Sequence, residues 1–289
     1  MLNPEHNHED IETAMICLGP KGSYGHEAAK IAVQKLQLEY DTPILFESTN
    51  VSVLQAAERG SGLGIIPVEN STYGDVVDVL GYLAKQSTSY PLRIIGEVEL
   101  PIRHCLLSKQ TIYHSTKLKG ILSHPQALGQ CSKSLKRWGF TQIESTTSTA
   151  SAAKFVAEHP EMDLGAIASK LAAKEYNLKV IEYDVQDLED NMTRFFVFGP
   201  KQESVPTGND KTVIIFRIPN EPGMLLETFV PFASRQINMT AIHSVSLGGW
   251  NYGFYIELEG HEKEARTLGA LLEMKECTKE FTILGSFPK

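Results

Sequence analysis

The feature that most constrains the fold is the stretch of residues 190–199. Its polar first half, Asp190 to Arg194, leads directly into the apolar run Phe195-Phe196-Val197-Phe198. An uninterrupted apolar run of this kind predicts a buried strand, and we expect its polar beginning to reach an open cavity. Residues 200–210 are polar and contain prolines and a glycine, which predicts a linker. The strand therefore closes one domain, and a second domain begins at Lys211.

Residues 15–199 alternate between short apolar runs and segments of helical spacing. The pattern predicts strands at 15–19, 63–67, 94–100, 103–107, 120–122, 140–144, 164–168, 180–183 and 193–199. It predicts helices at 23–38, 52–58, 74–84, 125–138, 149–159 and 170–176. Such alternation is typical of α/β domains with a mainly parallel sheet. Because the pattern repeats, we expect two α/β lobes with a cleft between them, lined by strand ends and helix N-termini.

The remaining residues, 211–289, have the order β-α-β-β-α-β, which is typical of a ferredoxin-like domain. We expect its first helix, 223–234, to be interrupted or to end near Pro231. Residues 1–14 are polar and acidic, and we expect them to be a disordered tail. They show neither a secretory signal nor a transit peptide, so the expected location is the cytoplasm.

Charge and cysteine content exclude several classes of partner. The net charge of −8, without clustered basic residues, argues against nucleic-acid and anionic-membrane binding. No apolar run reaches the roughly 18 residues that a membrane span needs. The four cysteines, Cys17, Cys105, Cys131 and Cys277, form no CxxC pair. A chain of this length does not need disulfides, so we expect free, buried thiols.

Two glycine-rich or polar turns follow predicted strands in the first half of the chain. In residues 19–25 the glycines allow close backbone approach, and Ser23 can cap the next helix while leaving N–H groups for an anion. In residues 67–74 the run from Glu69 through Asn70 and Ser71 places more polar side chains in a row than one helix cap requires. The alternative for each turn is a purely structural helix start.

Two further polar turns lie between a predicted strand and a predicted helix, at residues 123–127 and 145–150. In residues 123–127, Pro125 fits the first helical position, so Gln126 points outward from the first turn. Residues 145–150 include Ser148 and Thr149, which are also favoured helix caps. His104, His114 and His124 fall on different predicted elements without cysteine or carboxylate partners at ligand spacing. The sequence therefore predicts no metal site, and no cofactor is expected.

Together, in this order, the polar segments resemble the prephenate dehydratase family across residues 15–199. The stretches that carry the resemblance are Gly-Pro-Lys-Gly-Ser (19–23), Pro-Val-Glu-Asn-Ser (67–71), Ser-His-Pro-Gln-Ala-Leu (123–128), Ser-Thr-Ala (148–150) and Asn-Met-Thr-Arg-Phe (191–195). Residues 211–289 resemble the regulatory ACT domain that usually accompanies this enzyme. The resemblance implies a two-lobed catalytic domain like that of periplasmic binding proteins, and loss of CO2 and the ring hydroxyl from prephenate to give phenylpyruvate.

The resemblance also implies roles for individual residues. Thr193 would be the main catalytic group, assisting departure of the hydroxyl by a hydrogen bond. Asn70 and Gln126 would assist it, and the substrate would be bound by Ser23, Glu69, Ser71, Ser148, Thr149, Arg194 and Phe195. Arg194 suits a carboxylate but can equally brace the cleft through a structural ion pair. Phe195 would pack on the ring or in the core. Glu69 is unfavourable beside an anion unless it is protonated or turned away.

The ACT resemblance implies a phenylalanine site formed between two subunits, from Gly223, Met224, Leu225 and Ser244. Where the family usually has Glu-Ser-Arg-Pro, this chain has His243-Ser244-Val245-Ser246, so only the serine is kept. The sequence leaves open whether phenylalanine still regulates the protein. We expect a homodimer or homotetramer, because ferredoxin-like domains often pair their sheets edge to edge.

Two alternatives remain open at this point. One is arogenate dehydratase, which takes an aminated substrate with one more positive charge. The other is a small-molecule sensor without catalysis, which has no need of Thr193, Asn70 and Gln126 together.

Overall fold

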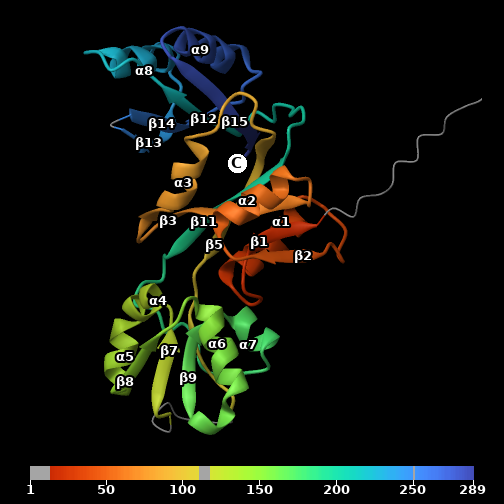
Figure 1. The fold of residues 1–289 in the computed structure, drawn as a ribbon, viewed down its shortest axis with the longest axis vertical. Coiled ribbons are helices and arrows are strands. Elements are labelled where there is room, and N and C mark those ends of the chain that lie inside the picture. The colour runs from red at the N-terminus through yellow and green to blue at the C-terminus, as the bar shows by residue number, and fades with distance from the viewer. Residues whose placement is uncertain (1–13, 111–117, 250) are drawn as a thin grey trace, which may run out of the picture.

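The computed structural model describes residues 14–110, 118–249 and 251–289. Three sheets, each with its own helices, follow one another along the long axis of the molecule (Figure 1). Residues 1–13, nearly all of the expected tail, lie outside the described part. Ala14 is buried, and its carbonyl accepts a hydrogen bond of 2.8 Å from the Leu63 amide. The folded part therefore includes Ala14.

The sheet of the first lobe has the strand order β2-β1-β3-β11-β5, and β4 pairs with β3. Its strands are β1 (Met15–Leu18), β2 (Ile44–Glu47), β3 (Leu63–Asn70), β4 (Gly74–Asp75), β5 (Leu92–Pro101) and β11 (Met192–Pro200). Its helices are α1 (Tyr24–Lys35), α2 (Asn50–Glu58) and α3 (Val77–Leu83). The expectation of a mainly parallel sheet is wrong here. Strand β11 returns from the second lobe and enters antiparallel between β3 and β5, so the sheet is mixed.

The second lobe is a sheet of order β10-β6-β9-β7-β8. Its strands are β6 (Cys105–Ser108), β7 (Gly120–Ser123), β8 (Gln142–Ser145), β9 (Leu164–Ala168) and β10 (Lys179–Glu182). Its helices are α4 (Pro125–Gln130), α5 (Ser132–Trp138), α6 (Thr149–Glu158), the 3-10 turn η2 (Pro160–Met162) and α7 (Lys170–Glu175). The single helix expected at 125–138 is divided at Cys131, because Asp187 accepts hydrogen bonds from the Ser132 hydroxyl and the Lys133 amide there.

The C-terminal domain has the expected β-α-β-β-α-β order. Its elements are β12 (Asp210–Arg217), α8 (Met224–Ser234), β13 (Met239–Gly248), β14 (Asn251–Glu259), α9 (Ala265–Glu276) and β15 (Glu280–Pro288). The antiparallel strand order β13-β14-β12-β15 is that of a ferredoxin-like sheet. Helix α8 continues through Pro231 and ends three residues later at Ser234.

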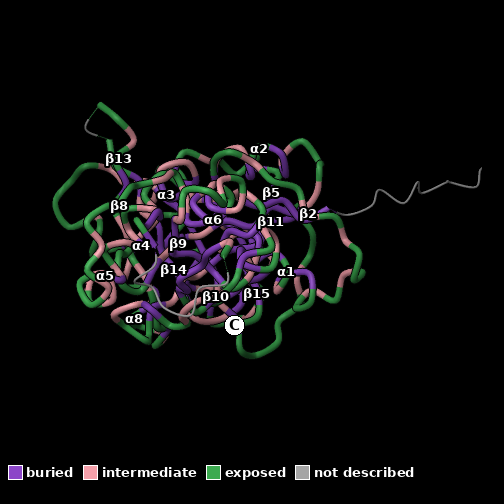
Figure 2. Tube along the Cα trace, turned by 90° about the horizontal axis from the view of Figure 1, so that it is seen from below, coloured by how far each residue is buried: buried purple, intermediate pink, exposed green. Residues whose placement is uncertain are grey.

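The C-terminal domain and the first lobe share one apolar core. The rings of Phe196 in β11 and Phe287 in β15 meet edge to face, with their centres 5.6 Å apart. A Cβ on Gly285 would lie only 2.2 Å from the Ile94 carbonyl oxygen, so the two backbones approach closely because this position is glycine. Helices α8 and α9 cover the other face of the sheet (Figure 1). The buried residues follow the strands through the middle of the molecule (Figure 2). This shared core fixes the C-terminal domain on the first lobe.

The thiols of Cys17, Cys105 and Cys131 are buried and unpaired, as expected, while that of Cys277 is half-buried and also free. Burial raises the pKa of Cys17 and Cys131 to about 12 and that of Cys105 to about 11, which keeps these thiols protonated and unreactive at neutral pH. In the described part of the chain, no helix has the length and apolar character needed to cross a membrane.

Candidate active site

A cleft of about 270 Å³ lies between the two lobes. The first lobe lines it with Ser23, Tyr24, Asn70, Thr193 and Phe195. The second lobe lines it with His124, Gln126, Gln130, Ser148 and Thr149. Ile102 and His104, where the chain passes from one lobe to the other, also line it. The four polar turns singled out in the sequence therefore meet at one place.

Thr193 and Asn70 are direct neighbours on strands β11 and β3. The Asn70 Nδ2 group donates to Thr193 Oγ1 over 2.9 Å, and it also lies near Asn191 Oδ1 and the Met192 carbonyl. Asn70 Oδ1 accepts from the Thr72 and Tyr73 amides, at 3.1 and 3.0 Å, which fixes the orientation of the side-chain amide. Because Thr193 Oγ1 accepts from Asn70, the Thr193 proton remains free to be donated toward the cleft.

Three helices begin at the cleft. Ser23 caps α1 by accepting from the His26 amide, and Ser148 caps α6 by accepting from the Ser151 amide. His124 caps α4. The first amides of a helix lack intrahelical partners, and they favour anions because the helix dipole is positive at this end. Among the described residues, neither lysine nor arginine lines the cleft, so these helix ends supply its positive potential.

His124 is held as a neutral ring. Its Nδ1 accepts from the Gln126 amide at 3.3 Å, which assigns the proton to Nε2. Burial lowers the pKa of His124, so the ring stays neutral at physiological pH. It therefore adds an N–H donor to the cleft without adding a charge.

A cluster of Tyr24, His104 and Gln130 also lies at the cleft, although the sequence motifs did not predict it. The Tyr24 hydroxyl lies 2.8 Å from His104 Nδ1, and His104 Nε2 lies 2.8 Å from Gln130 Oε1. Burial lowers the pKa of His104 and raises that of Tyr24 well above its usual value, so both are neutral at physiological pH. Tyr24 directly follows Ser23, the cap of α1, so its position in the sequence could have indicated that it faces the same cleft.

The first glycine-rich turn also joins the lobes. The Ser169 hydroxyl donates to the Gly22 carbonyl at 3.0 Å, and the Tyr176 hydroxyl donates to the Lys21 carbonyl at 2.6 Å. Gly22 has a φ of +83°, and a Cβ there would lie 3.0 Å from Ala172 Cα. A side chain at position 22 would therefore strain the turn and separate it from α7.

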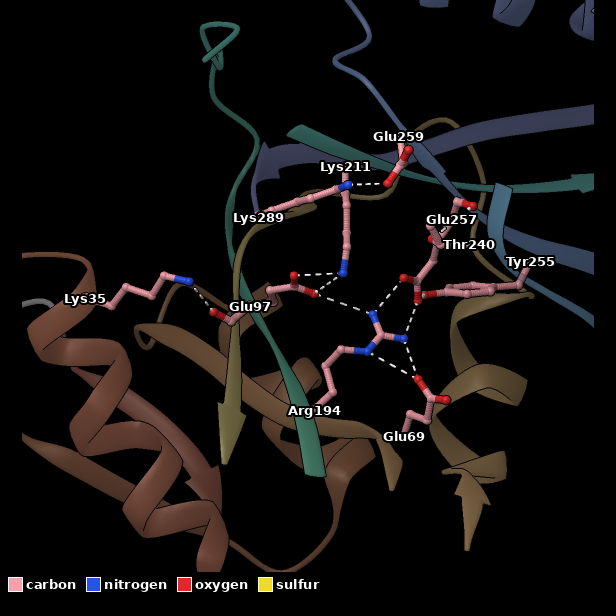
Figure 3. Close-up of polar contacts among 10 residues, drawn as sticks. All are labelled: Lys35, Glu69, Glu97, Arg194, Lys211, Thr240, Tyr255, Glu257, Glu259 and Lys289. Carbon is pink, nitrogen blue, oxygen red and sulfur yellow. Dashed lines mark hydrogen bonds and ion pairs between the residues drawn. The ribbon is translucent and has the colours of Figure 1, made fainter. Parts of the chain in front are cut away.

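Three of the proposed substrate-binding residues lie outside the cleft lining. Successive side chains of a strand point to opposite faces, so Thr193 and Phe195 face the cleft and Arg194 faces away. Arg194 binds Glu69 and the C-terminal domain instead (Figure 3). Ser71 Oγ accepts from the Met192 amide at 2.9 Å and so secures the beginning of β11. The other proposed residues, Ser23, Ser148, Thr149 and Phe195, all line the cleft.

A second hollow, of about 700 Å³, lies on the C-terminal domain. Gly223 and Leu225 line it, together with Arg217, Asn220, Glu221 and Tyr252 among others. The structure places Met224 at the start of α8 and Ser244 on the exposed face of β13, both outside this lining. It thus brings together two of the four residues expected to bind an effector.

His114 lies outside the described residues. Within the described ones, histidine, cysteine and carboxylate side chains form no group of three or more that would hold a metal ion.

Comparison with known proteins covers most of the chain. The family model of prephenate dehydratase matches residues 15–203. The bifunctional chorismate mutase/prephenate dehydratase of Aquifex aeolicus is 36% identical over 94% of this chain and 72% of its own. The prephenate dehydratase of Methanocaldococcus jannaschii is 34% identical over 96% of this chain and 99% of its own. Arogenate dehydratase 2 of Petunia hybrida is 33% identical over 93% of this chain and 71% of its own.

Two solved structures resemble the whole fold. The prephenate dehydratase of Arthrobacter aurescens in complex with L-Phe superposes with a TM-score of 0.86 at 28% identity, over 96% of this chain and 90% of that one. GqqA, described as a novel type of quorum quenching acylase, superposes with a TM-score of 0.85 at 27% identity, over 95% and 97%. The family match, the relatives and the fold agree, and the chain belongs to the prephenate dehydratase family.

Proposed function

We propose that this protein converts prephenate to phenylpyruvate, CO2 and water. The observation that carries the proposal is the pair formed by Thr193 and Asn70 in the cleft. Asn70 holds the Thr193 oxygen at 2.9 Å, so the hydroxyl proton is available to a leaving group in the cleft. The helix N-termini around it suit the two carboxylates of prephenate.

In the proposed reaction two bonds of the substrate ring break. The bond from the ring to its carboxylate breaks, CO2 leaves, and the electron pair enters the ring as the carbon–hydroxyl bond breaks. The departing oxygen leaves as hydroxide, stabilised by the Thr193 hydrogen bond, and becomes water by taking a proton from solvent. Aromatisation drives the reaction, so the protein has to position the dianion and stabilise the leaving group. Stabilisation of a leaving oxygen by one preorganised hydrogen-bond donor is worth on the order of 10²–10³-fold.

We assign the remaining residues by their positions. Gln126, Ser148 and Thr149 orient the carboxylates, and Phe195 packs under the ring. The Ser23 hydroxyl donates to the Leu18 carbonyl and accepts from the His26 amide, so Ser23 shapes the N-terminus of α1 at the cleft. Preorganised donors of this kind need no rearrangement as charge develops. Ser71, Glu69 and Arg194 act from behind the cleft wall, by securing β3 and β11.

The charges around the cleft favour prephenate over arogenate. An ammonium group needs an acidic acceptor, and Glu69 is the candidate that the sequence offers. Its carboxylate lies 2.7 Å from Arg194 and outside the cleft lining. Among the described residues, the lining contains neither aspartate nor glutamate.

The test is the ultraviolet detection of phenylpyruvate formed from prephenate by the purified protein. Arogenate is run in parallel, with phenylalanine as its expected product. Turnover of prephenate supports the proposal, and turnover of arogenate alone would favour the alternative substrate. Binding of prephenate by the folded protein without turnover would favour a sensor.

We propose that residues 15–199 are the catalytic domain, 200–210 the linker and 211–289 an ACT regulatory domain that binds L-phenylalanine. The hollow beside Gly223 and Leu225 supports this, because its lining includes a positive charge, Arg217, and a negative charge, Glu221. These charges suit the carboxylate and the ammonium group of an amino acid. Measuring turnover with and without phenylalanine tests it, and an unchanged rate at saturating phenylalanine would contradict it.

We further propose a homodimer or homotetramer in the cytoplasm. Strand β13 forms one edge of the C-terminal sheet and is exposed along much of its length, which suits pairing with a second copy. The buried free thiols suit a reducing compartment.

A further inference from the structure

Arg194 connects three segments that are far apart in the sequence (Figure 3). Its Nη1 and Nη2 bind the two Glu257 oxygens of strand β14, both at 2.7 Å. Nη2 also lies 2.7 Å from Glu69 Oε2 in β3, and Nη1 lies 3.5 Å from Glu97 Oε2 in β5. One guanidinium thus joins the first-lobe sheet to the C-terminal domain.

The partners of Arg194 are themselves held in place. Glu257 is 2% exposed, and one of its oxygens accepts from the Tyr255 hydroxyl at 2.6 Å. Glu97 accepts from Lys211 Nζ at 2.8 and 3.0 Å. Burial alone would lower the pKa of Arg194, but its bonds to Glu257 and Glu69 outweigh burial and raise it, so the charge is permanent.

This cluster lies directly behind the catalytic pair. Thr193 pairs with Asn70 across the antiparallel strands β11 and β3, and the adjacent pair is formed by Arg194, which follows Thr193, and Glu69, which precedes Asn70. The register between the two strands shifts between Arg194 and Phe195. A bulge of this kind interrupts the ladder of backbone hydrogen bonds, so side-chain contacts gain importance in fixing the register beside it.

We propose that Arg194 is a positioning residue, and that the C-terminal domain, through Glu257, sets the alignment of Thr193 with Asn70. The inference rests on the proposed reaction. A displacement of Glu257 shifts the guanidinium, the guanidinium shifts Glu69 and β11, and the Asn70–Thr193 bond lengthens. The charge that would otherwise bind substrate is used for alignment instead.

The chain provides a matched control in the ion pair of Arg93 and Glu262. It also joins the first-lobe sheet to the C-terminal domain, at 2.5 Å, and its side chains are 19% and 16% exposed. Arg93 pairs with Gly199, at the opposite end of β11 from Thr193. Its loss therefore weakens the same interface without disturbing the catalytic pair.

The experiment compares Glu257→Gln and Glu262→Gln in the full-length protein. Steady-state kcat and KM for prephenate are measured at a temperature well below the unfolding midpoint of each variant. Amide hydrogen exchange is followed in residues 68–75 and 190–196. We expect Glu257→Gln to lower kcat at least threefold with KM within twofold, and to speed exchange in both segments. Glu262→Gln is expected to keep wild-type kcat, KM and exchange there, even though its midpoint falls.

A milder variant, Tyr255→Phe, removes one donor to Glu257 and leaves the carboxylate in place, so it remains informative if Glu257→Gln fails to fold. We expect Tyr255→Phe to lower kcat and to speed amide exchange in the same two segments, each by less than Glu257→Gln does. The proposal would be overturned if Tyr255→Phe and any folded Glu257→Gln protein kept wild-type kcat and wild-type amide exchange. It would also be overturned if Glu262→Gln lost as much kcat as Glu257→Gln. Exchange does not depend on the reaction. It therefore tests the coupling separately from the proposed function, which fails if the wild-type protein does not act on prephenate.

Discussion

The Asn70 side-chain amide donates to Thr193 Oγ1 over 2.9 Å, from one strand of the first-lobe sheet to its neighbour. The same amide is oriented by two backbone N–H groups that donate to its oxygen. The Thr193 hydroxyl is thus held in place before any ligand arrives. Because Asn70 is the donor in this hydrogen bond, the Thr193 proton is not used in it. That arrangement suits a group that assists a leaving oxygen.

The first prediction concerns Asn70→Asp. The carboxylate cannot donate to Thr193, and it brings a negative charge into a cleft meant for a dianion. We expect kcat to fall more than tenfold and KM to rise. Steady-state kinetics with prephenate measures both, and circular dichroism confirms folding. A folded Asn70→Asp protein with unchanged kcat would show that the orientation of Thr193 is unimportant.

Arg194→Lys separates alignment from substrate binding. Lysine keeps the charge but loses the bidentate geometry toward Glu257. We expect the free energy of unfolding to fall by about 1–3 kcal/mol, as for other buried polar groups that lose a partner. KM for prephenate is expected to stay within twofold, because Arg194 lies outside the cleft lining. A large rise in KM with unchanged stability would instead make Arg194 a substrate ligand.

The buried His26 and His104 and the half-buried His124 predict a loss of stability in mild acid. Burial lowers the pKa of His26, His104 and His124 below the ordinary value of 6.5. The unfolded chain therefore takes up protons at a higher pH than the folded chain does. Their contribution to stability is complete above about pH 6.5 and is lost as the pH falls toward the lowered values.

The measurement is the thermal midpoint between pH 8 and pH 5, for the wild-type protein and for His104→Gln. His104 is 1% exposed, so we expect its removal to make the dependence on pH shallower. Parallel curves for the two proteins would show that His104 does not contribute.

The assembly prediction is tested by light scattering over a hundredfold range of protein concentration. We expect the mass of a dimer or tetramer at the upper end, because the edge strand β13 is available for pairing. A monomer mass at every concentration would contradict this.

The sequence predicted the elements around the cleft better than the way they pair. The caps at Ser23 and Ser148 are local features, since each is satisfied within its own first turn. The strand ending near Gly199 was also predicted correctly, because its apolar run is long. Its antiparallel position between β3 and β5 depends on contacts with residues about a hundred positions away, for which a single sequence carries no local signal.

The direction of Arg194 shows a second limit. Because side chains alternate along a strand, those of Arg194 and Thr193 point to opposite faces of the sheet. Which of the two faces the cleft depends on what packs against the other face of the sheet. That partner is Glu257, which lies 63 residues further along the chain and in another domain. Strand β2 was missed for a different reason. It is a short edge strand with two exposed apolar residues, Leu45 and Phe46, so its pattern does not resemble a buried strand.

The measurement that tests the central claim most directly is the turnover of prephenate by the wild-type protein, Thr193→Val and Thr193→Ser. Valine has nearly the shape of threonine without the hydroxyl, and serine keeps the hydroxyl. We predict at least a tenfold loss of kcat in folded Thr193→Val, and activity closer to wild type in Thr193→Ser. Wild-type turnover by folded Thr193→Val would contradict the role given to this hydroxyl.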